Sequence, residues 1–391
     1  MVLRHQVVGR IKIIKAFKGL KIHKGAQGPQ GPQGYPGPQG FQGPQGPQGP
    51  MMAPQGAKKK TGLIAAIIVV VVLIVGALGG YFYYKQTPTY SLKQIGAAIE
   101  NHDWSTFSQH VDVDQVSEDI LTGVVKSMAR YQVVGSSDAI IEDILDEYED
   151  EMQSDIDNVS KNLENYIRGK KTDADKNGKI DSFNFNKKFF DRFKYKKIES
   201  VEKIGNHAVA SVIYELPDLG TEVTVELEMS KLDNGSWMVD SIANADAVWT
   251  TIYDAYQKKL DEVNEPIRAE IAKYVSADEL IIRLNRISTN PNLFYIAKIK
   301  TMEKPVKDVE LAVTIMGVGE YNRIVEKTVT FHSNVQETGY HGPWYRSERL
   351  NSSDDDDRLL YFDFKDNTPI DFEVRKITFF DGTSIELKDE L

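Results

Sequence analysis

An uninterrupted apolar run at residues 63–84 constrains this 391-residue chain more than any other feature. The run contains no charged residue, follows three consecutive lysines and closes with four aromatic residues. A run of 22 residues rises about 33 Å as an α-helix, which is enough to cross a hydrocarbon core roughly 30 Å thick. Aromatic rings at the end of such a helix suit the boundary between lipid and water. The sequence therefore predicts a single transmembrane helix over residues 61–84.

The distribution of charge predicts the orientation of this helix. Residues 1–60 contain ten Lys or Arg and no Asp or Glu, whereas residues 61–391 contain 37 basic and 57 acidic residues, a net charge of −20. Basic flanks of a membrane span stay on the cytoplasmic side. We therefore expect a plasma-membrane protein with a cytoplasmic N terminus and its C terminus outside. A region this negative argues against nucleic acid as a partner.

Two compositionally distinct segments precede the predicted span. Residues 1–24 form a basic cytoplasmic segment without a clean amphipathic face, and its charge predicts attraction to anionic lipid headgroups of the bilayer. Residues 25–57 are collagen-like, with Gly at every third position from Gly25 to Gly49, mainly in Gly-Pro-Gln triplets. Such a tract forms either a solvated polyproline-like tether or a short trimeric triple helix. Its shortness favours the disordered tether.

Residues 88–245 change from helical to strand-like patterning, which indicates an α+β domain. Apolar spacings of three and four predict the helices, with a start at Ser136, Ser137 and Asp138 and a stop at Gly169. Strict alternation predicts the strands, and Asn234-Gly235 predicts a hairpin turn. The expected helices lie within residues 92–111, 116–131 and 140–167, and the expected strands within residues 207–216, 223–229 and 237–242.

Two stretches of this region resemble a bacterial family of unknown function. Residues 99–104, Ile-Glu-Asn-His-Asp-Trp, with Phe107 and residues 111–114, Val-Asp-Val-Asp, look like its opening helix-turn-helix. Residues 234–242, Asn-Gly-Ser-Trp-Met-Val-Asp-Ser-Ile, resemble the closing hairpin of nuclear-transport-factor-two-like or cystatin-like domains. The resemblance implies a cone-like fold in a single-pass membrane protein with a short cytoplasmic head. Many members begin with a zinc ribbon, which this chain, having no cysteine, does not carry.

The chain offers few residues for catalysis. The absence of cysteine excludes disulfides, thiolate metal sites and cysteine nucleophiles. A cone-like domain can enclose a pocket, and His102, Asp103, His110 and Asp112 could perform acid–base chemistry there. The same residue types serve equally as helix caps and turn residues. We predict that the protein is not an enzyme, and we expect no catalytic or cofactor-binding residues.

One motif has the spacing of a calcium-binding loop. Asp173, Asp175, Asn177 and Asp181 supply oxygen at loop positions one, three, five and nine, with Gly178 at position six. The backbone carbonyl of Lys179 would supply position seven. Position twelve is Asn184, which lacks a bidentate carboxylate, and four nearby lysines oppose a cation. The segment therefore predicts either a weak calcium site or a polar turn.

The remainder of the chain predicts a helical linker, residues 246–275, and an all-β immunoglobulin-like sandwich, residues 276–391. Pro266 is expected to end or kink the linker helix. Trp344, with Tyr340 and Tyr345, is expected in a loop, either as an exposed contact site or as core packing. The four aspartates 354–357 are expected in a solvated loop or, alternatively, near a cation. The seven predicted strands lie at residues 281–287, 293–302, 309–315, 324–331, 359–364, 372–380 and 384–388.

Together these features favour a bacterial cell-envelope protein of type II topology that binds or senses an unknown extracellular protein or ligand. An alternative is a hydrolase-like enzyme that uses the cone pocket. A second alternative comes from residues 388–391, Lys-Asp-Glu-Leu, which spell an endoplasmic-reticulum retention signal. The predicted topology would place that tetrapeptide in the lumen, although the same residues also continue the last predicted strand.

Overall fold

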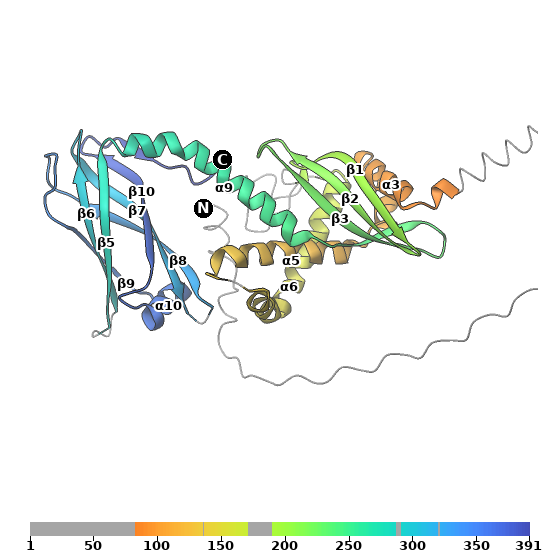
Figure 1. Cartoon of the computed structure of the whole chain (residues 1–391), viewed down its shortest axis with the longest axis horizontal. Helices are drawn as coiled ribbons and strands as arrows, with labels where there is room; N and C mark the ends of the chain where they lie inside the picture. The colour runs from red at the N-terminus through yellow and green to blue at the C-terminus, as the bar shows by residue number, and fades with distance from the viewer. Residues whose placement is uncertain (1–82, 136, 171–189, 287–290, 320) are drawn as a thin grey trace, which may run out of the picture. The chain divides into compact units, whose positions relative to one another are not determined.

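The computed structural model describes residues 83–135, 137–170, 190–286, 291–319 and 321–391, with the backbone alone at residues 147–151 (Figure 1). The basic segment, the glycine-rich tract and the predicted transmembrane segment, except for its last two residues, lie outside these ranges. Among the described helices, none combines the length and apolarity needed to cross a membrane.

Four helices open the described region, and each begins at a residue whose side chain caps it. The caps are Thr87, Asp103, Asp112 and Ser137, each accepting a hydrogen bond from a backbone N–H in the first turn. Gly169, with φ at +64°, lies directly beyond the last helix. The predicted helices 116–131 and 140–167 are therefore confirmed. The helices are α3 (Pro88–Glu100), α4 (Trp104–Ser108), α5 (Val113–Gln132) and α6 (Asp138–Ile167).

A four-stranded antiparallel sheet follows, in the order β1-β2-β3-β4. Figure 1 shows α3 packed beside this sheet. The predicted turn at Gly235, where φ is +86°, is confirmed. Strand β1 was not predicted: it carries four lysines and two glutamates, because an edge strand stays exposed and needs no apolar alternation. The strands are β1 (Lys194–Ile204), β2 (His207–Leu216), β3 (Thr221–Lys231) and β4 (Trp237–Ile242).

The long helix α9 (Ala245–Ile271) contacts α5 and β3, and also the later strands β10 and β11. We expected Pro266 either to end or to kink this helix. It does not end the helix, because other contacts hold the turns on both sides of the proline. Beyond the proline, Ile271 is 3% exposed, and Arg268 donates to Asp261 one turn before it and to Glu373 of β10. These contacts offset the backbone hydrogen bond that proline cannot make.

The C-terminal strands form two antiparallel sheets, ordered β5-β6-β9 and β11-β10-β7-β8. Both sheets contribute side chains to one hydrophobic cluster, including Tyr295 of β6 and Phe331 of β8, so they pack as a β-sandwich. With the first sheet, this arrangement makes the chain a mixed α+β protein with antiparallel sheets. The strands are β5 (Val275–Asn285), β6 (Asn292–Thr301), β7 (Val306–Val318), β8 (Arg323–His332), β9 (Trp344–Arg349), β10 (Ile370–Phe379) and β11 (Ser384–Glu386).

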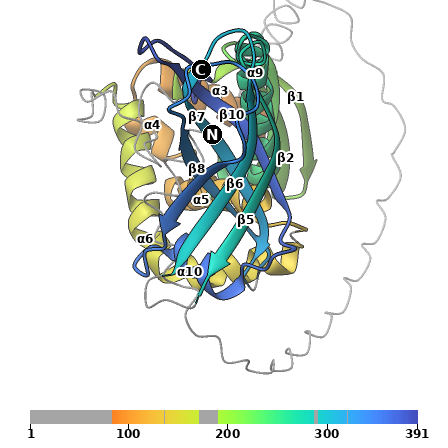
Figure 2. The same cartoon turned by 90° about the vertical axis from the view of Figure 1, so that its left-hand side faces the viewer.

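The prediction of a strand at residues 359–364 is wrong, because this segment belongs to helix α10 (Asp355–Asp363). Figure 2 shows α10 at one end of the sandwich. Asp354 caps the helix by accepting from Asp357 N–H at 2.9 Å, and the three aspartates that follow lie at the positive end of the helix dipole. Buried Asp357, Leu360 and Phe364 recur at spacings of three and four. Within the sandwich, the strand that was missed is β9, whose sequence Trp-Tyr-Arg-Ser-Glu-Arg is mostly polar.

Candidate functional site

An apolar pocket of about 570 Å³ lies in the N-terminal α+β part of the chain. Helices α3, α6 and α9 and one face of the sheet β1-β2-β3-β4 supply its walls. Among the described residues that line it, Lys93 and Glu100 alone carry a charge, and both belong to α3. Ligand sites typically measure 300–1,000 Å³ and are lined mainly by apolar and aromatic side chains. This pocket therefore has both the size and the chemistry of a ligand site.

The strand period explains why one face of the sheet lines the pocket. Side chains two residues apart point to the same side, so Val212 and Tyr214 of β2 face the helices together. Their neighbours on β3, Val225 and Leu227, do the same, and Val212 lies directly opposite Val225. The pocket is bordered by members of two separate hydrophobic clusters, so the core of this region is divided rather than continuous. The interruption between these clusters is what leaves the pocket unfilled.

One part of the lining, which we call the aromatic wall, consists of Tyr166, Phe190, Phe193, Tyr195 and Tyr214. The rings of Tyr166 and Phe190 are 4.9 Å apart between centroids. Tyr214 makes edge contacts with Phe193 at 6.4 Å and with Tyr195 at 6.3 Å. These separations and edge-on orientations are favourable for aromatic pairs. The rings therefore support one another in two groups beside the pocket, one formed by Tyr166 and Phe190 and the other centred on Tyr214.

Tyr214 contributes a polar group to this wall. Burial raises the pKa of Tyr214 to about 12, with smaller contributions from the neighbouring phenols of Tyr195 and Tyr166. Its hydroxyl is therefore un-ionised at neutral pH and can donate or accept one hydrogen bond.

The opposite part of the lining is aliphatic, and α3 contributes much of it through Leu92, Ile95 and Ile99. Gly96 lies on the same helix and also borders the pocket. A Cβ atom built at Gly96 would have no heavy atom within 4 Å. The wall at Gly96 is therefore open enough to accept a side chain, which makes this position a direct handle on the pocket.

The four residues considered for acid–base chemistry do not line this pocket. Asp103 caps α4, accepting from Thr106 N–H at 3.1 Å and from the Thr106 hydroxyl at 2.6 Å, and these hydrogen bonds lower the pKa of Asp103. Asp112 caps α5. His102 and His110 each form a bond from Nδ1 to a backbone carbonyl, of Ile167 at 3.0 Å and of Trp237 at 2.9 Å. All four therefore hold local structure.

The residues of the calcium-like loop, Asp173, Asp175, Asn177, Lys179 and Asp181, lie outside the described residues. Within the described ranges, no group of three or more His, Asp or Glu side chains is arranged to hold a metal ion. Calcium binding by this loop therefore stays a prediction from the sequence.

The aspartates 354–357 form the start of α10 and two ion pairs with strand β8, not a solvated loop. Asp357, 6% exposed, pairs with Lys327 and accepts from Asn351 N–H at 2.7 Å. Asp356 accepts from the Arg323 guanidinium at 3.3 Å. Burial raises the pKa of Asp356. For Lys327, burial acts against the charged form, but the hydrogen bond and the charge of Asp357 prevail and raise its pKa. These pairs attach α10 to the sandwich.

The aromatic residues expected in one loop take different positions. Trp344 and Tyr345 belong to β9, where Trp344 packs against the sandwich core and Tyr345 is 69% exposed. Tyr340 lies in the preceding loop and is exposed. Both alternatives considered for this group, core packing and exposure, are therefore realised by different members.

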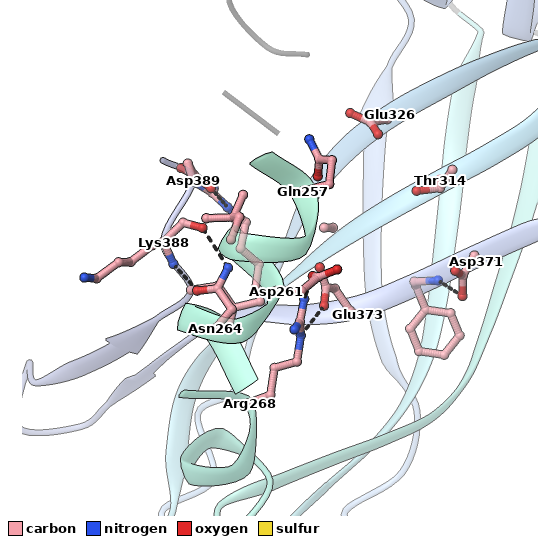
Figure 3. Close-up of a pocket in the computed structure, with 15 residues that line it drawn as sticks. Gln257, Asp261, Asn264, Arg268, Thr314, Glu326, Asp371, Glu373, Lys388 and Asp389 are labelled. Carbon is pink, nitrogen blue, oxygen red and sulfur yellow. Dashed lines mark hydrogen bonds and ion pairs between the residues drawn. The ribbon is translucent and has the colours of Figure 1, made fainter. Parts of the chain in front are cut away.

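A second cavity, of about 290 Å³, lies between α9 and strands β7, β8 and β10 (Figure 3). Arg268 donates to Glu373 at 3.1 Å. Asn264, 4% exposed, donates to the backbone carbonyl of Lys388 at 2.9 Å and accepts from the Lys388 N–H at 2.8 Å. Arg375 pairs with Asp389 and Glu310. Because these groups bind one another, we interpret the residues around this cavity as a structural contact between α9 and the sandwich.

The residues of the apolar pocket were not predicted as a site. A signal was present, since Val212 and Tyr214 continue the alternation of one strand and the aromatic residues at 190, 193 and 195 lie close together in the sequence. Alternation alone cannot distinguish a filled core from a pocket. Comparison with known proteins adds no further assignment, because no family model, no curated protein and no solved structure matches this chain.

Proposed function

We propose that this chain is a membrane-anchored binding or sensing protein of the cell envelope that holds an apolar ligand in the pocket beside the aromatic wall. The pocket itself is the observation that carries this proposal. A cleft of about 570 Å³ that is lined mainly by apolar and aromatic side chains keeps those side chains from packing fully against one another, which stability alone does not favour. A ligand-binding function accounts for the presence of this pocket.

The arrangement of the helices and the first sheet supports the cone-like fold that the sequence resemblance implies. Helices α3 and α6 cover the face of the sheet that lines the pocket, as expected for a domain that encloses a cavity. The C-terminal strand order supports an immunoglobulin-like assignment. Lettering β5 to β11 as A, B, C, C′, E, F and G gives one sheet A-B-E and one sheet G-F-C-C′. In this scheme α10 occupies the E–F connection.

The alternatives have less support in the geometry. The acid–base residues of the enzyme hypothesis serve as caps and backbone contacts away from the pocket. A retention signal requires a tetrapeptide that a receptor can engage. Here the backbone of Lys388 is bound to Asn264, and the Asp389 carboxylate is bound to Arg375. These contacts favour the simpler interpretation that residues 388–391 continue the sandwich.

Photolabelling of the full chain in lipid nanodiscs tests the binding proposal. The probe is a neutral long-chain alcohol that carries a diazirine in its alkyl chain, and labelled peptides are located by mass spectrometry. We expect labels in α3, β2 and β3, because these elements line the pocket. Labelling confined to peptides outside the pocket would contradict the proposal whatever the behaviour of any variant.

A matched pair of variants makes the test specific. Gly96→Phe should reduce the labels in β2 and β3, because nothing opposes a new side chain at this exposed position, which borders the pocket. Lys258→Phe places the same group on an exposed position of α9 that does not line the pocket, and it should label like the wild type. Circular dichroism of both variants verifies that each remains folded.

A further inference from the structure

The outer face of the sheet β5-β6-β9 carries a shallow cleft of about 710 Å³, which shares no lining residue with the apolar pocket. Strand pairing places its residues in rows across the three strands. Arg283, Phe294 and Ser347 form one row, and Ile296 and Tyr345 lie opposite each other in the next. These side chains of β6 point away from the sandwich core, because the residues that alternate with them on β6 are fully buried.

The centre of the cleft exposes apolar and aromatic surface to solvent. Tyr345 is 69% exposed and Phe294 is 40% exposed. Ile281, which lies opposite Ile296, is 38% exposed and extends the same surface beyond the lining. Single exposed apolar residues are common, whereas a group of them rimmed by polar residues is typical of an interaction surface.

Two arginines of the cleft, Arg283 and Arg346, differ from the other arginines that the structure describes. Each of those others interacts with a partner, as Arg286 does by donating to the carbonyl oxygens of Tyr361 and Phe364. Within the described ranges, no ion pair or hydrogen bond engages the guanidinium groups of Arg283 and Arg346, and no Asp or Glu belongs to the described lining. Both groups can therefore pair with an anion from outside the chain.

The acidic residues next to the cleft do not cancel its positive charge. Glu279 lies opposite Lys298 on the neighbouring strand, so these two add no net charge. Glu348 accepts from the hydroxyl of buried Tyr295 at 3.4 Å, on the other face of the sheet. The net charge of −20 over residues 61–391 repels a distant anion, but at physiological salt such a field decays over about 8 Å. The two arginines therefore dominate the electrostatics of contact at the cleft.

We propose that this cleft docks an acidic amphipathic helix of another protein. Carboxylates of that helix pair with Arg283 and Arg346, and an apolar side chain between them lies on Phe294 and Tyr345. Arginine and tyrosine are enriched among the residues that contribute most to protein–protein binding, and a guanidinium can hold a carboxylate through two parallel hydrogen bonds. The surface lies in the sandwich, so it adds a partner-binding role to the ligand binding proposed for the apolar pocket.

Spacing and shape favour a helix over other anionic partners. Arg283 and Arg346 belong to the outer strands β5 and β9, which lie about 9.6 Å apart because neighbouring strands are separated by about 4.8 Å. Helix residues seven positions apart lie about 10.5 Å apart on one face, together with those three and four positions along. A flat lipid surface does not enter a hollow, and a hydrated phosphate polymer gains nothing from an apolar centre.

Binding of a designed helical peptide to the full chain in nanodiscs of zwitterionic lipid tests the proposal. The peptide carries two Glu residues seven positions apart, with Leu three and four positions after the first. A control peptide of the same composition has one Glu moved to the opposite face of the helix. Fluorescence anisotropy should give a dissociation constant about tenfold lower for the first peptide, because the control loses one pair between arginine and carboxylate.

Substitutions on the sandwich assign the binding to the cleft. Arg283→Gln with Arg346→Gln should weaken binding of the first peptide at least about tenfold. Lys300→Gln with Lys307→Gln removes the same charge from exposed positions outside the cleft and should preserve the binding. Replacing both arginines by Glu should transfer the preference to a peptide with Lys in place of its two Glu residues. Such a gain cannot arise from loss of folding.

A dye at the cleft locates the bound peptide independently. Because the chain has no cysteine, Ser347→Cys provides a single attachment point for an environment-sensitive dye. Its emission should change when the first peptide is added. The same dye at Val335→Cys, an exposed position outside the cleft, should not respond.

The outcomes separate this proposal from the function proposed for the apolar pocket. Equal binding of the two peptides, unchanged binding after loss of both arginines, or no binding at millimolar peptide would each overturn the docking of an acidic helix. Capture of phosphatidylglycerol vesicles through Arg283 and Arg346, without binding of the peptide, would assign the cleft to a lipid surface and overturn it as well. None of these results bears on photolabelling of the apolar pocket, which stands on its own measurement.

Discussion

At the scale of single residues, the phenol of Tyr214, which lines the pocket, makes the free energy of unfolding depend on pH. Burial raises its pKa to about 12, so folding favours the neutral phenol. The stability that this preference contributes is complete below the ordinary tyrosine pKa near 10 and is lost as pH rises through 12. Wild-type protein should therefore lose about 2 kcal/mol more than Tyr214→Phe between pH 9 and pH 12.

Urea unfolding at a series of alkaline pH values measures this difference. Spectrophotometric titration of the phenols provides a second measurement, in which the variant should lack one late-titrating tyrosine. If the two proteins lose stability in parallel, the Tyr214 hydroxyl is hydrated in solution and the pocket is open to water at that point.

Two helical glycines should respond in opposite directions to the same substitution. Gly96→Ala should raise the free energy of unfolding by about 0.5–1 kcal/mol, because alanine restricts the unfolded chain and its methyl group meets nothing in the folded one. Gly123→Ala should lower it, because its methyl group would lie 2.8 Å from the backbone carbon of Ala245. Urea unfolding of both variants provides the comparison, and a gain at Gly123 would show that α5 and α9 separate easily.

At the scale of elements, the attachment of α10 to the sandwich depends on ion pairs that are buried with the helix. Asp357→Asn should destabilise the chain by about 3–5 kcal/mol, because Lys327, with its side chain 14% exposed, would keep its charge without a partner. The double variant Lys327→Met with Asp357→Asn should recover most of that loss. A double-mutant cycle by chemical denaturation measures the coupling, and purely additive effects would mean that the pair is hydrated and weak.

Elements specified by local chemistry were predictable from the sequence, and those specified by distant contacts were not. Helix α6 has its cap at Ser137 and its stop at Gly169 within its own sequence, and β2 alternates clearly. Strand β9 has no such pattern, because it is fixed by pairing with β6 at one side. Residues 359–364 form a short apolar and aromatic run that suggests a strand, but the lysine and arginine that anchor the aspartates of α10 lie about 30 residues earlier, in β8.

The pocket was unpredictable for a similar reason. The α+β class followed from the order of helices and strands, but an apolar pocket is a property of how four elements meet. No single element records the gap between the clusters around Trp237 and around Leu216. For the residues considered for acid–base chemistry, the alternative of caps is the one that the structure shows for Asp103 and Asp112, because Asp beside a helix start is informative about capping and uninformative about catalysis.

At the scale of the whole molecule, calcium should act as a stabilising ligand if the loop predicted at residues 173–181 binds it. Binding to the folded state alone raises stability by about 2.7 kcal/mol at a hundredfold excess over the dissociation constant. The chain should then melt at a higher temperature in millimolar calcium than in chelator. Asp173→Ala should abolish that difference, and Lys176→Ala, at a position that supplies no ligand, should preserve it. Equal melting temperatures of the wild type in the two buffers would reduce the loop to a turn.

The double hydrogen bond between Asn264 and Lys388 has a consequence for synthesis. The two residues are 124 positions apart, so Asn264 leaves the ribosome long before its partner exists. At bacterial and eukaryotic elongation rates this delay lasts roughly 6–25 s. Throughout that time Asn264 of α9 lacks the backbone groups of Lys388 that it binds in the folded protein. Helix α9 of the nascent chain is therefore accessible to proteases and chaperones until residues 388 and 389 leave the ribosome.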